Sequence, residues 1–216
     1  MYSGITRGVF PVTSVDKRSG VIHFSVELTP ELVRDISIGA SVGIDGVCLT
    51  VVAHDGLILT FDAIAETCAR STLGELHVGR GVSVERSCRV GDELGGHDVF
   101  GHVIGTASVV AATPVGEALD LTLSVPKGWM KFILHKGFIA LDGSSLTVGD
   151  VAPEGRFDVH LIPETLRVTN FARRKVGDRV NVELDARTIA IVETVERVLA
   201  ERDAQARTTG GAGASS

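Results

Sequence analysis

The sequence is poor in cysteine, in aromatic residues and in positive charge. Its three cysteines, Cys48, Cys68 and Cys88, are odd in number and form no CxxC pair, so neither a disulfide framework nor a cysteine zinc site is expected. Lysine and arginine total 21 against 27 acidic residues, which gives a net charge of −6. Because phosphate binding requires a concentrated basic face, nucleic acid is not expected as a partner. Reduced thiols are typical of a cytoplasmic protein.

Long apolar segments and metal-ligand clusters are absent as well. No apolar run approaches the roughly 20 residues needed to cross a bilayer, and the N-terminus lacks the charged and apolar regions of a signal peptide. We therefore expect no membrane partner. His97 and His102 form the one close histidine pair, but no neighbouring cysteine or carboxylate pair completes a site, so no metal is expected.

The residues that are present suit a compact, turn-rich protein. The chain has 216 residues, of which 44% are apolar and 25 are glycine. This length is enough for two small domains or one large one. With 22% charged residues and no strongly basic region, the composition fits a globular protein that binds a small, neutral or weakly polar ligand.

An internal repeat is the strongest feature of the sequence. The phrase IDGVCLTVV at residues 44–52 recurs as LDGSSLTVG at residues 141–149, and this shift of 97 aligns Cys48 with Ser145 and Gly4 with Gly101. At a shift of 98, residues 66–85 match residues 164–183 at seven of twenty positions. Composition alone would give about one match. The chain is therefore interpreted as a tandem duplication.

Each half has the pattern of a small all-β barrel. Alternating apolar residues predict strands in VIHFSVEL, LDLTLSV, GVSVER and RVNVEL, and SVGIDGVCLTVV predicts a hairpin around Asp45-Gly46. About six such strands per half favour a closed barrel, because closure removes exposed strand edges. Short helices are expected to interrupt each half, one beginning at Thr29 and Pro30 and another in PKGWMKFIL.

The C-terminal segment differs from both halves. Its spacing predicts an amphipathic helix, capped by Asp185, whose apolar stripe comprises Ile191, Val192, Val195, Val198 and Leu199. A single helix beyond two barrels needs a partner to bury that stripe, and three such helices packed together would provide it. Self-association is therefore expected. The last residues, TTGGAGASS, have the composition of a flexible tail.

Taken together, these motifs resemble the α-type riboflavin synthases from residue 1 to about residue 202. The matching phrases are MYSGI, GVCLTV, ETCARSTLGEL, GGHDVFGHV, KGFIALDGSSLTVG, LIPETLRVTN, VGDRVNVELD and ETVERVL. Tyr2 stands where the family usually has Phe. The resemblance implies an all-β fold of two tandem six-stranded Greek-key barrels, both lumazine-binding, at residues 1–97 and 98–187. It further implies an oligomerisation helix at 188–206 and a flexible tail at 207–216.

The resemblance also implies an activity. The protein would be a riboflavin synthase, a transferase that uses two molecules of 6,7-dimethyl-8-ribityllumazine. One molecule would give a four-carbon unit to the other, forming riboflavin and 5-amino-6-(ribitylamino)uracil, with no cofactor. The family implies a homotrimer in which the first barrel of one copy faces the second barrel of another, and it leaves open an association with lumazine synthase.

A dismutation needs two copies of one molecule in different roles, which suits an imperfect duplication. Two breaks in the repeat stand out: Cys48 aligns with Ser145, and Ile5 aligns with His102. Histidine is a natural proton carrier, and His102 is the candidate for that role. Thr147 could stabilise a substrate anion by hydrogen bonding.

The acceptor's nucleophile is not decided by the residues. Water activated by Cys48, Ser41 or Asp185 is one option, and Cys48 itself is another. The resemblance assigns catalytic positions to Ser41, Cys48, His97, His102, Thr147 and Asp185.

Substrate contacts also follow from the resemblance. The pocket of the first barrel would use Gly4, Ile5, Thr6, Cys48, Leu49, Thr50, Asp62, Ala63, Ile64, Ala65, Glu66 and Thr67. The pocket of the second barrel would use Gly101, His102, Val103, Lys136, Ser145, Leu146, Thr147, Ile162, Pro163, Glu164, Thr165, Leu166 and Arg167. The Glu-Thr pairs occur in both halves, so we expect them to meet the ribityl hydroxyls.

A non-catalytic lumazine or flavin carrier is the alternative function. Such carriers share the duplicated barrel and lose the chemistry of one half. This sequence keeps Cys48, His102 and Thr147, which favours the enzyme. Taken alone, Cys48 could be a small buried apolar residue and Asp185 a helix cap.

Overall fold

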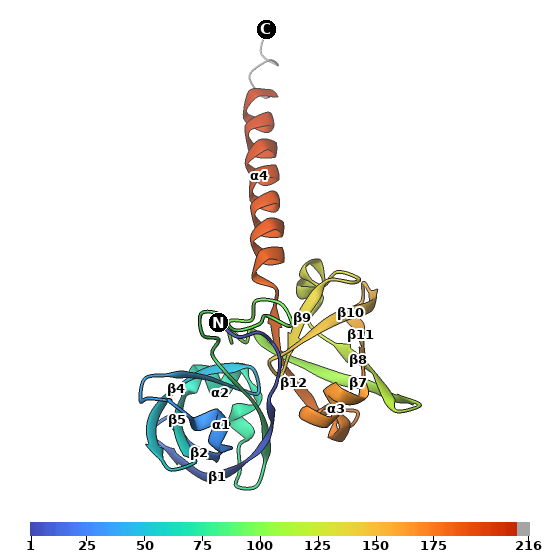
Figure 1. Ribbon diagram of the computed structural model, residues 1–216. Coiled ribbons are helices and arrows are strands. Elements are labelled where there is room, and N and C mark those ends of the chain that lie inside the picture. Colours follow the sequence, from blue (N-terminus) through green and yellow to red (C-terminus); the bar gives the residue numbers. More distant parts are fainter. Residues whose placement is uncertain (211–216) are drawn as a thin grey trace.

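The computed structural model describes residues 1–210, with side chains through residue 206, as two closed β-barrels and a long C-terminal helix (Figure 1). The barrels lie next to each other, the N-terminus lies near their junction, and the helix extends away from both. Each barrel contains six strands that pair antiparallel, so the predicted duplicated all-β fold is confirmed.

The first barrel, here the N-barrel, has the strand order β1-β2-β5-β4-β3-β6. Its strands are β1 (Gly8–Arg18), β2 (Val21–Glu27), β3 (Ser41–Ile44), β4 (Val47–Asp55), β5 (Ile58–Ile64) and β6 (Gly81–Arg86). Helix α1 (Pro30–Val33) joins β2 to β3, and α2 (Ala65–Arg70) with the 3-10 helix η1 (Thr72–Glu75) joins β5 to β6. Pro30 begins α1 as predicted, although the Thr29 side chain makes no capping hydrogen bond.

The second barrel, here the C-barrel, repeats the same cyclic order as β10-β11-β8-β7-β12-β9. Its strands are β7 (Gly105–Val115), β8 (Ala118–Ser124), β9 (Phe138–Leu141), β10 (Ser144–Ala152), β11 (Arg156–Leu161) and β12 (Arg179–Leu184). Between them lie the 3-10 helix η2 (Lys127–Phe132), α3 (Pro163–Val168) and the 3-10 helix η3 (Phe171–Arg173). The helix predicted in PKGWMKFIL is therefore a 3-10 helix.

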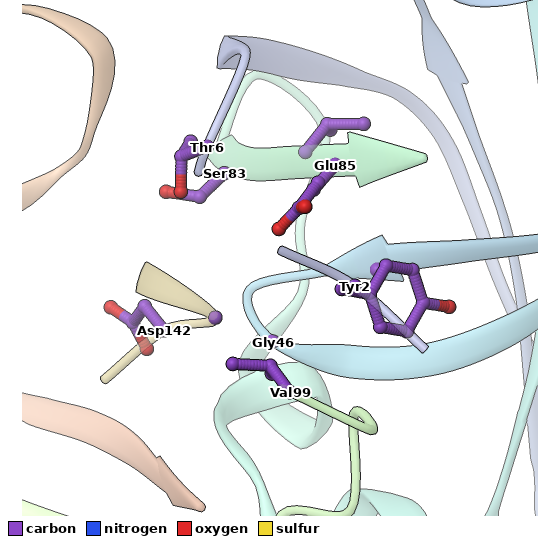
Figure 2. Close-up of a pocket in the computed structure, with 10 residues that line it drawn as sticks. Tyr2, Thr6, Gly46, Ser83, Glu85, Val99 and Asp142 are labelled. Atoms are coloured by element: carbon purple, nitrogen blue, oxygen red, sulfur yellow. The ribbon is translucent and has the colours of Figure 1, made fainter. Parts of the chain in front are cut away.

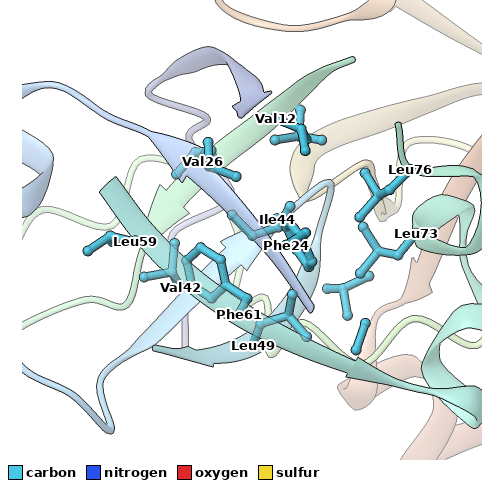
Figure 3. Packing of buried hydrophobic residues seen from close by; sticks show 14 of the residues in the cluster. Val12, Phe24, Val26, Val42, Ile44, Leu49, Leu59, Phe61, Leu73 and Leu76 are labelled. Carbon is cyan, nitrogen blue, oxygen red and sulfur yellow. The ribbon is translucent and has the colours of Figure 1, made fainter. Parts of the chain in front are cut away.

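Each barrel is filled by the apolar residues that alternate along its strands. In the N-barrel, Phe24 on β2 and Phe61 on β5 are cross-strand partners with ring centroids 5.6 Å apart (Figure 3). Both side chains are fully buried, and burying such a residue stabilises the fold by roughly 1.5–3 kcal/mol. The equivalent pair in the C-barrel is Leu121 and Val159, so the two cores share a register but not their side-chain volumes.

The two Asp-Gly hairpin turns pack directly against each other at the junction of the barrels. Asp45 and Asp142 both have a φ of +44°, as a tight turn between antiparallel strands requires. A Cβ placed on Gly46 would lie 2.3 Å from the backbone nitrogen of Gly143. Glycine is therefore required at Gly46 by close backbone approach as well as by its positive φ.

Buried polar contacts fix these two turns. Asp45 accepts a hydrogen bond of 2.7 Å from the Ser83 amide and pairs with Arg80 at 3.0 Å. Asp142 likewise accepts from the Asn181 amide at 2.8 Å and pairs with Arg174. Burial, reinforced by the neighbouring Asp142, raises the pKa of Asp45 to about 7, while Arg80 acts in the opposite direction.

A segment from the start of each half crosses to the other barrel. The Ser145 amide in the C-barrel donates to the Gly4 carbonyl at 2.8 Å, and the Cys48 amide in the N-barrel donates to the Gly101 carbonyl at 3.0 Å. Between these contacts the two segments pair with each other: the Tyr2 amide donates to the Val99 carbonyl at 2.6 Å, and the Val99 amide donates back at 3.1 Å. The halves have therefore exchanged equivalent segments.

Two equivalent glutamates hold the crossing segments in place. Glu85 on β6 accepts from the amide and the hydroxyl of Ser3, both at 2.7 Å. Glu183 on β12 accepts from the amides of Phe100, Gly101 and His102 at 2.7–3.1 Å. Burial raises the pKa of each glutamate, and the amide hydrogen bonds act against this rise.

Helix α4 (Ala186–Gly210) is longer than the segment predicted at 188–206. Residues 207–210 of the predicted tail are helical, because propagating an existing helix adds one hydrogen bond for each residue fixed. Residues 211–216, the rest of that predicted tail, lie outside the described residues. Asp185 caps the helix as predicted, accepting from the Thr188 amide at 3.0 Å and its hydroxyl at 2.6 Å. Within residues 1–206, no helix is long and apolar enough to cross a membrane.

The contact between the two turns predicts different costs for two alanine substitutions. Gly46 and Gly56 have φ values of +77° and +57°, so either alanine should cost about 1–2 kcal/mol in left-handed strain. A Cβ on Gly56 meets nothing within 4 Å, whereas one on Gly46 meets the Gly143 backbone, which should add about 1–3 kcal/mol. Urea denaturation of Gly46→Ala and Gly56→Ala measures both; equal losses would contradict a tight junction.

Candidate active site

The N-barrel has a surface cavity of about 210 Å³ beside Cys48, which we call the N-cavity. It lies between the start of β4, the helix α2 and the crossing segment of the second half. Its lining residues are Val47, Cys48, Glu66, Thr67, Arg70, Ser71, Gly101, His102 and Val103.

The C-barrel has an equivalent cavity of about 380 Å³ beside Ser145, which we call the C-cavity. It lies between the start of β10, the helix α3 and the crossing segment of the first half. Its lining residues are Gly4, Ile5, Thr6, Arg7, Ser144, Ser145, Leu146, Ile162, Glu164, Thr165, Arg167, Val168 and Thr169.

The pairing of crossing segments with barrels is opposite to the sequence-based expectation. Gly4, Ile5 and Thr6 were expected in the pocket of the first barrel, and they line the C-cavity. Residues 101–103 were expected in the pocket of the second barrel, and they line the N-cavity. The reason is the exchange at the junction, where each segment forms its hydrogen bonds with the opposite barrel.

Cys48 and Ser145 occupy the same place in the two barrels but have different partners. Each lies opposite a residue of the preceding strand, Gly43 for Cys48 and Ala140 for Ser145. The Tyr2 hydroxyl donates to the Cys48 sulfur at 3.1 Å. Ser145 Oγ instead accepts from the His97 amide at 3.1 Å and lies 2.6 Å from His97 Nδ1. The asymmetry predicted at this position therefore extends to the surrounding side chains.

His97 is held between Ser145 and the ring of Phe138. Its ring stacks on Phe138 with centroids 5.1 Å apart and an interplanar angle of 17°. Burial lowers the pKa of His97, although Asp185 and Asp98 act to raise it. The ring is therefore neutral at pH 7, and it can exchange a proton with the Ser145 hydroxyl.

Asp185 lies at the start of α4, where it influences His97 electrostatically and caps the helix. Partial burial acts to raise the pKa of Asp185, but hydrogen bonds from Thr188 and Arg187 outweigh it, and the pKa is lowered. Asp185 is thus a carboxylate at neutral pH. Its two hydrogen bonds with Thr188 occupy Oδ2, so its capping role is evident from geometry alone.

His102 lies at the mouth of the N-cavity with its side chain exposed. Its amide is fixed by Glu183 at 3.1 Å, while its ring lies 6.1 Å from that of Phe100. The backbone is thereby held and the ring is left accessible to a ligand in the cavity.

Several predicted residues line neither cavity. They are Ser41, Leu49, Thr50, Asp62, Ala63, Ile64, Ala65, His97, Lys136, Thr147, Pro163, Leu166 and Asp185. Leu49 and Ala63 belong to the N-barrel core. Asp62 lies 2.6 Å from His23 Nδ1, its cross-strand partner. Thr50 and Thr147 are exposed on equivalent strands β4 and β10.

The cavities also contain residues that sequence reasoning missed, among them Ser71 and Thr169. These two occupy equivalent positions in the repeat, and each hydroxyl donates at 2.6 Å to a carbonyl four residues earlier, that of Thr67 or Thr165. A hydroxyl at both positions was a signal that the repeat comparison could have found. Arg70 and Arg7 carried no comparable signal, because their equivalents in the other half are not basic.

Among residues 1–206, no group of three or more histidine, cysteine, aspartate or glutamate side chains is placed to hold a metal ion. A narrow crevice remains at the barrel junction, lined by Tyr2, Glu85, Val99 and Asp142 among others (Figure 2). Its volume of about 10 Å³ is at the lower limit for a single water. The two barrel cavities occupy equivalent places in the two halves, and on that ground they are the candidate ligand sites.

Solved structures with a similar fold include two of LumP. The structure of LumP complexed with riboflavin superposes with a TM-score of 0.79 at 24% identity, covering 86% of this chain and all of LumP. The structure of LumP complexed with 6,7-dimethyl-8-(1'-D-ribityl) lumazine gives a TM-score of 0.77 at 23% identity. At these identities the likeness establishes the fold alone.

Sequence comparison is more specific. The model of the lumazine binding domain matches residues 3–87 and again residues 100–185. The riboflavin synthase of Escherichia coli strain K12 is 44% identical over 204 residues, covering 94% of this chain and 95% of that protein. The riboflavin synthase of Brucella abortus is 40% identical over 192 residues, covering 86% and 93%. With two matched repeats and relatives of this identity over nearly its whole length, the chain belongs to the lumazine-binding family of riboflavin synthases.

Proposed function

We propose that this protein is an enzyme that converts two molecules of 6,7-dimethyl-8-ribityllumazine into riboflavin and 5-amino-6-(ribitylamino)uracil. One observation carries the proposal: the chain has two equivalent cavities whose chemistry differs at Cys48 and Ser145, and at His102 and Ile5. Equivalent cavities suit two copies of one substrate. Different side chains at the same place allow one copy to donate the four-carbon unit and the other to accept it.

Each cavity would bind one lumazine through groups that both halves share. Glu66 and Thr67 in the N-cavity, and Glu164 and Thr165 in the C-cavity, supply the same carboxylate and hydroxyl for a ribityl chain. The crossing segments line one side of each cavity, where they would contact the ring system. LumP, which has the same fold, has been crystallised with both riboflavin and the ribityllumazine.

The reactive groups divide between the cavities. We assign His102 as the proton carrier of the N-cavity, because it is the histidine that lines this cavity and its side chain is exposed there. We assign Cys48 as the group that attacks, or activates water against, the ring of the accepting lumazine. In the C-cavity, His97 and Ser145 form a pair that can hold or pass a proton.

Apposition of the two lumazines requires more than one copy of the chain. Both cavities open to the surface, and we propose that the N-cavity of one copy faces the C-cavity of another within a homotrimer. Holding two reactants together can supply roughly 7–11 kcal/mol of the barrier. The apolar stripe of α4 supports assembly, because Ile191, Val195, Val198 and Leu199 are 47–65% exposed.

The cellular setting is also part of the proposal. We place the protein in the cytoplasm, since Cys48, Cys68 and Cys88 are all free thiols. An association with lumazine synthase stays a prediction, because no described surface is assigned to it.

Turnover without additives is the first prediction. The purified protein, mixed with 6,7-dimethyl-8-ribityllumazine alone, should form riboflavin and the uracil product in equal amounts, as followed by absorbance and chromatography. Binding of the lumazine with no riboflavin formed would instead support the carrier function.

A matched pair of cysteine variants tests the assigned chemistry. Cys48→Ser makes the two cavities alike at this position and should lower kcat by about 10²-fold, with KM changed by less than about threefold. Cys88→Ser makes the same chemical change outside both cavities and should keep wild-type turnover. If Cys48→Ser raises KM by as large a factor as it lowers kcat, the thiol only shapes the pocket.

Charge on the exposed stripe of α4 tests the assembly. Val195→Glu places a carboxylate among apolar side chains and should reduce the trimer to monomers with little turnover, as measured by light scattering and riboflavin formation. Arg197→Gln changes the net charge by the same amount. At 100° per residue, Arg197 lies about 160° around the helix from the centre of the apolar stripe of α4. The Arg197→Gln variant should stay trimeric and active. A trimeric Val195→Glu variant would contradict the assigned interface.

A further inference from the structure

Three equivalent positions of the two halves differ together around the barrel junction. The first half has Tyr2, Gly43 and Cys48, where the second half has Val99, Ala140 and Ser145. All of these except Ser145 and Gly43 belong to one small cluster of apolar and sulfur-bearing side chains at the junction. A large residue therefore faces a glycine in one half, and a small residue faces an alanine in the other.

The Tyr2 ring lies beside Gly43 on β3. A Cβ on Gly43 would be in ordinary van der Waals contact with the ring, 3.4 Å from Cε1 and 3.6 Å from Cδ1. The cross-strand partner of Gly43 is Cys48 on β4. A ring lying over Gly43 is therefore directed at Cys48, and the sulfur is within reach of its hydroxyl.

The position of Tyr2 is fixed along its backbone as well as at its ring. Its amide donates to the Val99 carbonyl at 2.6 Å, and the next residue, Ser3, is bonded to Glu85 at 2.7 Å. The side chain is 2% exposed, and Figure 2 shows it at the junction beside Val99. Both the backbone and the ring of Tyr2 are thus held at the junction.

The hydroxyl of Tyr2 has one hydrogen-bond partner among the side chains of residues 1–206, which is Cys48 Sγ at 3.1 Å. Burial strongly raises the pKa of Tyr2, and the contact with Cys48 adds to this rise. The phenol therefore stays protonated at neutral pH, and it acts as a donor to sulfur. In the second half Val99 has no such group, and Ser145 is bonded to His97 instead.

We propose that Tyr2 is a positioning residue for Cys48, which fixes the sulfur at the edge of the N-cavity and stabilises its thiolate by donating a hydrogen bond. The proposal rests on the proposed function, in which Cys48 acts on the accepting lumazine. The thiol proton leaves to solvent, and the phenol keeps its own proton, so Tyr2 is neither consumed nor ionised. Tyr2 itself touches no reacting atom.

The reactivity of the three cysteines tests this role without any substrate. Iodoacetamide alkylates thiolates, and mass spectrometry of the full-length protein after digestion follows Cys48, Cys68 and Cys88 in one sample. Tyr2→Phe keeps the ring over Gly43 and removes only the donor. Loss of one hydrogen bond to a charged sulfur should slow alkylation of Cys48 at pH 7.5 by about three- to tenfold and move its pH midpoint upward by about 0.5–1 unit.

Cys68 and Cys88 are the internal controls, because neither is bonded to Tyr2, and their rates should stay the same. An unchanged pH midpoint for Cys48 in Tyr2→Phe would overturn the proposal. Equal changes in the alkylation rates of all three cysteines would also overturn it, because they would indicate a general loosening of the fold. Val99→Leu, which alters the junction without removing the donor, should leave the midpoint of Cys48 in place.

Turnover separates this inference from the proposed function. If Tyr2→Phe shifts the alkylation midpoint and lowers kcat by a similar factor with KM nearly constant, both stand. If the midpoint shifts while the wild-type protein forms no riboflavin, the positioning of Cys48 stands and the proposed activity fails. If riboflavin is formed and the midpoint does not move, the activity stands and the role of Tyr2 fails.

Discussion

The contact between the two Asp-Gly turns is the constraint on which the arrangement of the barrels depends. Gly46 and Gly143 bring two backbones together with no room for a Cβ, and buried aspartates bind each turn to its own barrel through a strand amide. Because neither turn can move without uncoupling a buried carboxylate, the two barrels are held in one relative position. The narrow crevice that remains between the barrels is too small for a ligand, and the N-cavity and the C-cavity lie beside the crossing segments instead.

That fixed junction is also what allows the halves to exchange segments. With the barrels packed together at the junction, the first residues of each half reach the opposite barrel and form one side of its cavity. Each ligand site is therefore made by both halves, and a substitution in one crossing segment changes the chemistry of the other barrel. Ile5 gives the C-cavity an apolar wall, while His102 gives the N-cavity a titratable one. The crossing segments thus make the N-cavity and the C-cavity chemically different.

Much of the fold could be predicted because it depends on local sequence patterns. Strand alternation, the turn at Asp45 and the cap at Asp185 each depend on a few neighbouring residues, and all three are confirmed. The exchange of segments could not be predicted, since residues 4–6 and 101–103 keep the same pattern whichever barrel they join. Side-chain contacts such as that of Tyr2 with Cys48, 46 residues apart, were inaccessible for the same reason. The repeat comparison located the asymmetric position but not its partners.

The exchanged segments bear on how such a chain could have arisen. A half-length ancestor, with one barrel and one N-terminal arm, could not have completed its own pocket, since the arm belongs to the neighbouring barrel. Two identical copies trading arms about a twofold axis would have had two complete and identical pockets. The junction therefore has the arrangement expected of two identical copies that exchange arms, contained in a single polypeptide whose halves differ in sequence.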